Sequence, residues 1–368
     1  MFCLIIILLA QTADYGSTGP YSNVSYRMVN IPGTYENMNN SRIYYPSQGN
    51  TVDPAAVPCP IIVFGHGFQM GIDRYYSYAT HLASWGYVVV LPTISNPTLT
   101  PEHYTRARSM VDAARYVASL NNNPNDIFYG KLDATNWGFA GHSMGGGLAL
   151  LAADTFRLRD TLRAVVSLAS PQTTPPTHPQ HLQVPKMILA GSVDNIAPWN
   201  DVKSAYWVNS PEPGVFAVIN GANHGQFMDY SYFWENGGTA TINRETQLKI
   251  ARRHMTAFFN RYLKNEETDW NFQYTYGDSI NGHPTMYLVE VNYNPSGIDS
   301  RKTFPERKVI IGSKLKITER KGTAYVYDIT GNLIEILETP AEWEPGTSLR
   351  RNLFIIKIKQ EVIHFIRI

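Results

Sequence analysis

The feature that most constrains the fold is a serine enclosed by glycines, at residues 141–145 in the order Gly-His-Ser-Met-Gly. A short apolar run, residues 137–140, precedes it, and a stretch of small and apolar residues, 146–151, follows it. This pattern is typical of a sharp turn between a strand and a helix, where glycines tolerate the crowded backbone and the serine hydroxyl stays exposed. It predicts a nucleophile elbow at Ser143, and a glycine-rich turn that only enters a helix is the alternative.

A nucleophilic serine needs a histidine base, and that base needs a carboxylate to fix its tautomer. In proteins that carry a nucleophile elbow of this kind, the chain order is serine, acid, histidine. Two further apolar runs, residues 185–191 and 215–219, lead into polar loops that contain Asp194 and His224 respectively. Because the carboxyl ends of parallel strands meet at one edge of an open sheet, we expect these two residues to form a catalytic triad with Ser143.

Other acidic and histidine residues compete for these roles. Asp201 falls at a predicted helix start, where a carboxylate usually caps the helix, and Asp229 follows the candidate base too closely to be its partner. Three other histidines are more typical of surface or packing positions: His178 and His181 in a proline-rich loop, and His254 in an amphipathic helix. None of them displaces the acid and base assigned above.

An oxyanion hole must direct two backbone N–H groups at the charge that develops on a carbonyl oxygen. The residue after the nucleophile, Met144, is expected to supply one of them. The other is expected from the loop that follows the apolar run at residues 61–64. Phe68 is the predicted donor in this loop, and Gln69 is the alternative.

Residues beside these motifs are expected to contact the substrate. The predicted substrate-binding set consists of His66, Gly67, Gln69, His142 and Trp199. Three more aromatic residues, Phe68, Tyr75 and Tyr76, could line the same cleft, although each is more typical of a packing position.

The order of the segments predicts the fold class. Helical patterns at residues 104–120 and 245–263 alternate with apolar strands near residues 61, 88, 137, 163, 186 and 215. This alternation is typical of an α/β fold with a largely parallel sheet flanked by helices. We place the catalytic domain at residues 14–266.

These motifs resemble the α/β-hydrolase superfamily over residues 42–264, and within it the cutinase-like, polyester-hydrolase-like and chlorophyllase-like esterases. Residues 141–147 and 194–198 are similar to the cutinase-like nucleophile and acid segments. Residues 60–92 resemble both the cutinase-like and the chlorophyllase-like branches. The resemblance implies an α/β-hydrolase fold and a secreted serine hydrolase that cleaves carboxylic esters through an acyl-enzyme. Its substrate would be an acyl ester, a lipid or a polyester.

One departure bears on the substrate. Polyester-cleaving cutinases carry a Trp-His pair after the strand that follows the nucleophile helix, and the tryptophan stacks on the polymer. Here the strand at residues 162–168 continues into residues 169–173, which contain no aromatic side chain. The difference favours another substrate without ruling out polyester. A lipase or phospholipase, a peptidase of the same fold, and a non-catalytic surface-binding protein are the alternatives.

Composition limits the class of protein further. The chain of 368 residues is 43% hydrophobic and 17% charged, which is enough for a large core and a second, smaller domain. A net charge of +1 gives no reason to expect a nucleic-acid partner. We find no nucleotide-binding glycine fingerprint and no His-Glu zinc motif, so we expect no cofactor and no metal. We expect a monomer.

Residues 1–13 contain an apolar run that is too short to span a bilayer and is typical of a signal-peptide core. The run lacks the usual basic start, and a buried N-terminal strand is the alternative. The only cysteines are Cys3 and Cys59, and loss of the first would leave one thiol and no intrachain disulfide.

Residues 267–300 are interpreted as a linker or as the end of the catalytic domain, and residues 301–368 as a β-rich, sandwich-like domain. Its expected strands lie at residues 309–311, 315–317, 324–328, 353–359 and 362–368, with a turn at 331–332. The segments 326–334 and 354–358 resemble the C-terminal sorting domains of the type IX secretion system, although Asn352 stands where those domains usually carry glycine. The resemblance implies secretion machinery as a partner and a secreted or cell-surface location. A carbohydrate- or surface-binding module is the alternative.

Overall fold

The computed structural model describes residues 14–95, 102–266, 285–292 and the strands between residues 308 and 366, with short gaps at residues 157, 159, 177–178, 183, 209 and 212. The predicted signal segment with Cys3, and His178, Asn352 and the turn at residues 331–332, lie outside the described residues. The chain divides into two compact units, Met1–Asn294 and Pro295–Ile368, and each is described by itself.

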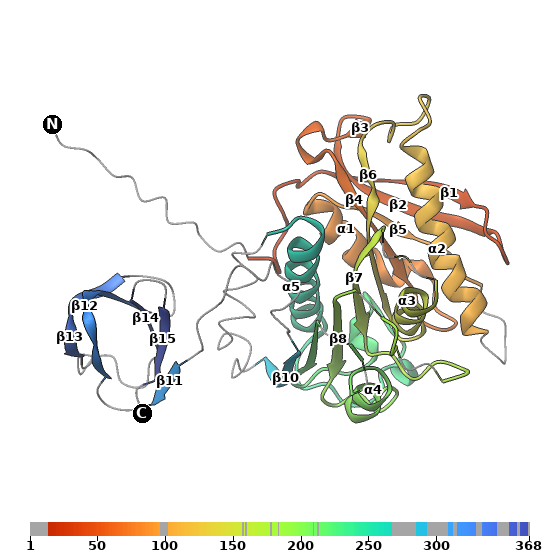
Figure 1. The fold of residues 1–368 in the computed structure, drawn as a ribbon. Coiled ribbons are helices and arrows are strands. Elements are labelled where there is room, and N and C mark those ends of the chain that lie inside the picture. The colour runs from red at the N-terminus through yellow and green to blue at the C-terminus, as the bar shows by residue number, and fades with distance from the viewer. Residues whose placement is uncertain are drawn as a thin grey trace. The chain divides into compact units, whose positions relative to one another are not determined.

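The described part of the first unit contains a ten-stranded sheet in the order β1-β2-β5-β4-β6-β7-β8-β9-β10, with β3 paired to β2 (Figure 1). The strands are β1 (Val24–Ile31), β2 (Met38–Gln48), β3 (Thr51–Val52), β4 (Cys59–Gly65), β5 (Val88–Leu91), β6 (Leu132–His142), β7 (Leu162–Leu168), β8 (Lys186–Gly191), β9 (Gly214–Ile219) and β10 (Met286–Asn292). The six strands from β5 through β4 and β6 to β9 pair in parallel, whereas β1, β2 and β10 pair antiparallel at the two sides. The predicted α/β-hydrolase fold is confirmed.

Helices cover both faces of the sheet, as Figure 1 shows. They are α1 (Tyr76–Ser84), α2 (His103–Leu120), α3 (Met144–Thr155), α4 (Trp199–Tyr206) and α5 (Arg244–Leu263), together with the short 3₁₀ helices η1 (Pro54–Ala56), η2 (Ile72–Tyr75), η3 (Gly225–Phe227) and η4 (Phe233–Glu235). Buried residues of α2, α3 and α4 belong to one core cluster, and those of α1 and α5 to another.

The two clusters explain why the central strands are continuous apolar runs. Successive side chains of a strand point to opposite faces, and in β4 Ile61 and Val63 enter the cluster of α2 and α3, while Ile62 and Phe64 enter that of α1 and α5. A strand covered on both faces can expose no polar side chain at either face. This is the signal that predicts the parallel strands from sequence.

The predicted set of strands lacked the outermost strands of the sheet, β1 and β10. In β1 half-buried and exposed side chains alternate along most of the strand, so it lacks an apolar run. Strand β10 pairs with β9, which places Met286–Asn292 in the first unit. Strand β6 begins at Leu132, five residues before the apolar run that predicts it.

The described strands of the second unit form a five-stranded sheet in the order β11-β15-β14-β12-β13. They are β11 (Lys308–Ile311), β12 (Leu315–Asp328), β13 (Leu333–Trp343), β14 (Leu353–Ile358) and β15 (Glu361–Ile366). The two strands expected within residues 315–328 are one long strand, and β13 was missing from the predicted set. The predicted sandwich and the sorting role stay predictions.

Burial sets the chemistry of Cys59, at the start of β4. Its side chain is fully buried, and its thiol donates to the carbonyl oxygen of Ala56 at 3.3 Å. Burial raises the pKa of the thiol to about 12. Since the thiolate is the reactive form, this cysteine is a packing residue.

His81 makes the stability of the first unit depend on pH. This buried residue of α1 contacts the carbonyl oxygen of Tyr15 at 2.9 Å and the Thr256 hydroxyl at 3.0 Å through Nε2. Burial lowers its pKa to about 4, whereas an unfolded histidine titrates near 6.5. The neutral ring therefore stabilises the fold fully above pH 6.5, and that contribution is lost as the pH falls toward 4.

Between pH 8 and pH 5, we expect the free energy of unfolding of the wild type to fall by about 2 kcal/mol more than that of His81→Gln. The glutamine amide can donate to the same carbonyl oxygen, but it does not titrate. Urea unfolding at both pH values measures the difference. Equal losses in the two proteins would show that His81 is not the titrating group.

Candidate active site

The candidate residues follow neighbouring strands at one edge of the sheet. Ser143 comes directly after β6, Asp194 lies three residues after β8, and His224 five residues after β9. The loop with Phe68 follows β4. These four strands run parallel, so their carboxyl ends lie at the same edge.

Ser143 has a backbone conformation that few non-glycine residues adopt, with φ 53° and ψ −123°. Its N–H donates to the carbonyl oxygen of Leu168 at 2.8 Å, and its own carbonyl accepts from Gly146 and Gly147 at 3.1 and 3.2 Å. Backbone strain of this kind persists only where surrounding contacts hold it, and it is concentrated at functional sites. The half-buried serine thus stands at the junction of β6 and α3 as the motif predicts.

The glycines around the serine allow three backbone segments to touch. A methyl group placed on Gly145 would overlap the carbonyl of Gly65 at the end of β4, and one on Gly141 would overlap the backbone of Gly145. A methyl group on Gly67 would lie 3.6 Å from Cβ of Ser143. The loop after β4 therefore packs directly on the nucleophile turn.

Asp194 and His224 are joined by a hydrogen bond in a buried setting. Nδ1 of His224 donates to Oδ2 of Asp194 at 2.8 Å, and the two residues are 4% and 5% exposed. The other carboxylate oxygen, Oδ1, accepts from the N–H groups of Ile196 and Ala197, both at 2.9 Å. The carboxylate is held by three hydrogen bonds, and Nδ1 of the imidazole is fixed as a donor, which leaves Nε2 for another partner.

His142 connects this pair to the serine. Its ring centroid lies 4.6 Å from that of His224, and Ser143 is the next residue in the chain. The hydroxyl of Ser143 has no hydrogen-bond partner among the described residues.

The competing acids have other partners. Asp229 accepts from the N–H of Ser77 at 2.9 Å and from its hydroxyl, and burial raises the pKa of this carboxyl. Asp201 is exposed in the first turn of α4. His181 is exposed near Asp154, and His254 is buried within α5. Neither acid hydrogen-bonds to His224 in the described structure.

The candidate oxyanion donors are the N–H groups of Phe68 and Met144. The N–H of Met144 is the first of α3 and has no partner within the helix. Neither group donates to a described residue, and the same is true of Gln69, which therefore stays the alternative to Phe68. The N–H of Gly67, in contrast, donates to the Tyr75 hydroxyl at 3.0 Å.

Tyr75 is a residue whose role the sequence analysis missed. Its hydroxyl also lies 2.9 Å from Nδ1 of His142, so one buried oxygen links the loop after β4 to the nucleophile turn. Burial raises the pKa of Tyr75 well above its usual range, so the hydroxyl stays protonated. A tyrosine ten residues after a strand carries no signal of this contact.

Two of the predicted substrate-binding residues are buried. His66 is 1% exposed, with Nδ1 on the carbonyl of Gly67 at 2.9 Å and Nε2 accepting from the N–H of Ile94 at 3.1 Å. His142 is also 1% exposed. Burial lowers the pKa of both rings. Both rings thus present almost no accessible surface in this structure, and their contact with substrate stays a prediction.

The other three residues of the predicted substrate-binding set are either accessible to solvent or close to the serine. Gln69 is exposed in a left-handed conformation with φ 55°. Trp199 is half-buried at the start of α4, with its ring 5.7 Å from that of Tyr287. Gly67 adjoins Ser143 as described above. Their contact with substrate stays a prediction.

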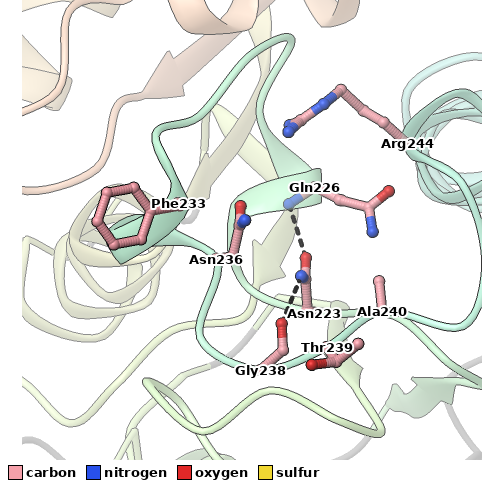
Figure 2. Close-up of a pocket in the computed structure, with 8 residues that line it drawn as sticks. All are labelled: Asn223, Gln226, Phe233, Asn236, Gly238, Thr239, Ala240 and Arg244. Atoms are coloured by element: carbon pink, nitrogen blue, oxygen red, sulfur yellow. Dashed lines mark hydrogen bonds between the residues drawn. The ribbon is translucent and has the colours of Figure 1, made fainter.

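The loop that carries His224 is held from α5. Arg244 donates to the carbonyls of Gly225 and Met228 at 2.7 and 2.6 Å and to the Ser231 hydroxyl at 2.7 Å. Next to it lies a cavity of about 510 Å³. Its lining residues, shown in Figure 2, are Asn223, Gln226, Phe233, Asn236, Gly238, Thr239, Ala240 and Arg244.

Two absences among the described residues bear on the site. No group of three or more His, Cys, Asp and Glu side chains there could hold a metal ion. In the same part of the chain, no helix is both long and apolar enough to cross a membrane.

The serine turn between β6 and α3, with the acid and histidine on later loops at the same edge, defines an α/β-hydrolase. Residues 11–274 match the PET hydrolase-like family, and the chain belongs to that family. It is similar to a bis(hydroxyethyl) terephthalate hydrolase of Streptomyces coelicolor, with 26% identity over 56% of this chain and 61% of the relative.

Two cutinases are similar to the same degree. Cutinase est1 of Thermobifida alba is 26% identical over 56% of this chain and 64% of its own length. Cutinase 2 of Thermobifida cellulosilytica is 28% identical over 49% and 62%. The chain thus spans about three fifths of the length of these relatives.

The contact between Gly145 and Gly65 predicts the cost of a single methyl group. We expect Gly145→Ala to lower the free energy of unfolding by about 2 to 3 kcal/mol, because backbone atoms on both sides must move. Gly147→Ala in the same helix is the control, since its methyl group would meet the ends of the Thr173 and Tyr206 side chains at 3.2 Å and would lie at an ordinary contact distance of 3.7 Å from the nearest backbone atom, the carbonyl oxygen of Pro171. Chemical unfolding of both variants measures the effect. Equal losses would contradict the backbone contact.

Proposed function

We propose that the protein is a serine hydrolase of carboxylic esters that uses Ser143, His224 and Asp194 as its catalytic triad. The observation that carries the proposal is the buried 2.8 Å hydrogen bond between His224 and Asp194, beside the strained serine. A carboxylate that fixes the tautomer of a histidine next to a serine is the arrangement that makes a hydroxyl nucleophilic at neutral pH.

In the proposed reaction, Oγ of Ser143 attacks the ester carbonyl carbon while Nε2 of His224 takes the hydroxyl proton. The N–H groups of Phe68 and Met144 stabilise the oxyanion, each contributing about 3 kcal/mol of barrier reduction. The imidazolium gives its proton to the leaving alkoxide, and the C–O bond of the ester breaks. Water then attacks the acyl-enzyme in the same way and releases the acid.

We infer a polyester or a related hydrophobic ester as the substrate class. The relatives are named as cutinases and as a bis(hydroxyethyl) terephthalate hydrolase, which supports ester bonds of that kind. The tryptophan expected after β7 in polyester-cleaving cutinases has no counterpart in residues 169–173, where Ser170 is fully buried and hydrogen-bonds to Ser167 at 2.7 Å. An aromatic contact to the substrate must come from elsewhere in the molecule.

We also propose that the enzyme is secreted or held at the cell surface. The apolar segment at residues 1–13 and the type IX-like pattern of residues 301–368 support export, with the secretion machinery as a partner. We propose that the catalytic domain acts as a monomer without a cofactor.

The triad is tested by substitution. We expect Ser143→Ala and Asp194→Asn each to lower kcat/KM for p-nitrophenyl esters by at least about 10³-fold, because the nucleophile or the base tautomer is lost. Asp201→Asn removes an exposed carboxylate near the acid and should retain activity within about twofold. Assays from acetate to palmitate and on a polyester film measure the effect and place the chain-length optimum. A Ser143→Ala variant with wild-type activity would disprove the mechanism.

Tyr75 is proposed to position the oxyanion loop and His142. We expect Tyr75→Phe to lower kcat about tenfold with little change in KM, because the N–H of Gly67 and the ring of His142 lose their common partner. Tyr78→Phe is the matched control, because the buried Tyr78 hydroxyl has no hydrogen-bond partner among the described residues. Steady-state kinetics with a soluble ester measure both. Equal activity of the two variants would remove Tyr75 from the positioning role.

A further inference from the structure

The loop after the candidate base exposes a group of aromatic side chains. We define the aromatic loop as residues 229–236. Its exposed aromatic residues are Tyr230, Tyr232, Phe233 and Trp234, at 44%, 51%, 83% and 63% exposure. Contiguous exposed apolar patches of this kind mark interaction sites, because leaving such rings in water is unfavourable.

The rings form one ordered surface. Tyr232 and Trp234 stack with their centroids 4.8 Å apart and their planes at 14°, and Phe233 meets Trp234 edge-on at 4.9 Å. Figure 2 shows the Phe233 ring directed away from Asn223 and Gln226, on the outer side of the loop. Three exposed rings are thus held together on one part of the loop.

A buried ion pair holds the aromatic loop in place. Arg74 of η2 contacts Glu235 at 2.5 Å, and their side chains are 9% and 11% exposed. The guanidinium also lies 4.8 Å from the ring centroid of Tyr230 and 5.2 Å from that of Tyr232. Because the backbone of the loop is fixed in advance, binding a surface costs little further conformational entropy.

The aromatic loop adjoins the candidate active site on two sides. The N–H of Gly225, next to His224, donates to the carbonyl of Asn236 at 3.2 Å, and Asn195, next to the acid, donates to the carbonyl of Gly237 at 2.8 Å. Arg74 directly precedes Tyr75, which holds the oxyanion loop. A surface bound by these rings would therefore lie beside the triad.

The carboxylate and amide side chains of the aromatic loop are already paired. Glu235 binds Arg74 and the N–H of Tyr232, and the side chain of Asn236 accepts from Ser231 at 2.7 Å. The Tyr230 hydroxyl donates to Asp73. A polysaccharide or a charged ligand would find few free polar partners beside the rings, whereas an uncharged apolar surface needs none.

We propose that the aromatic loop docks the enzyme on the surface of a solid polyester that contains aromatic rings. The inference rests on the proposed function for its substrate class, and it supplies the aromatic contact that is missing after β7. The rings of Phe233 and Trp234, which are the most exposed of the group and stand nearly perpendicular to each other, contact the polymer by the face of one and the edge of the other, and hold an ester bond near Ser143.

The test separates binding from catalysis. Adsorption of full-length Ser143→Ala to a poly(ethylene terephthalate) film is compared with that of the same protein carrying Phe233→Ala and Trp234→Ala. We expect the partition coefficient to fall at least fivefold. Tyr129→Ala is the control, because this exposed aromatic residue precedes β6 at the opposite edge of the sheet, and it should not change adsorption. Trp234→Phe keeps an aromatic face and should retain most of it.

In proteins with Ser143 intact, the ratio of film hydrolysis to p-nitrophenyl acetate hydrolysis should fall by a similar factor in the double variant. The acetate rate of the wild type alone tests the esterase function, so failure of the two proposals can be told apart. Unchanged adsorption in the double variant, with an unchanged unfolding midpoint, would overturn the docking role. Loss of binding to cellulose or to phosphatidylcholine vesicles, but not to the film, would overturn polyester as the occupant.

Discussion

The close contact between two backbone turns is the constraint on which the rest of the site depends. The turn after β4 and the turn after β6 touch at Gly65 and Gly145, where no side chain fits between them. This contact allows the N–H groups of Phe68 and Met144 to lie on neighbouring turns, and it leaves Ser143 strained at the helix start. The Tyr75 hydroxyl completes the arrangement by binding the Gly67 N–H and His142 together.

Much of this framework could be predicted because it depends on local patterns. A strand buried on both faces is a continuous apolar run, and a serine in a crowded turn needs glycines beside it. These two signals locate β4 through β9 and predict the order of serine, acid and histidine. The hydrogen bond between Asp194 and His224 joins loops that the pattern predicts at one edge of the sheet.

What sequence reasoning missed depends on contacts between distant segments. Arg74 and Glu235 are separated by 161 positions in the chain. The Tyr75 hydroxyl contacts both the turn after β4 and the turn after β6, and neither its sequence neighbours nor its distance from a motif indicates these contacts. Histidines beside glycine motifs were interpreted as substrate contacts, but His66 has both ring nitrogens bonded to backbone groups. The sequence around these histidines does not indicate how deeply they are buried. Burial, however, is what distinguishes a side chain that can contact substrate from one that holds a loop in place.

The neutral state of His142 connects this packing to the proposed chemistry. Its ring lies 4.6 Å from that of His224, which in the proposed mechanism becomes an imidazolium when it accepts the serine proton. A second charged histidine at that distance would oppose the step by like-charge repulsion. Burial, followed by the proximity of His224, keeps the pKa of His142 well below its ordinary value, so the neighbouring ring stays neutral. The close packing that buries His142 thus keeps an uncharged ring beside the proposed base.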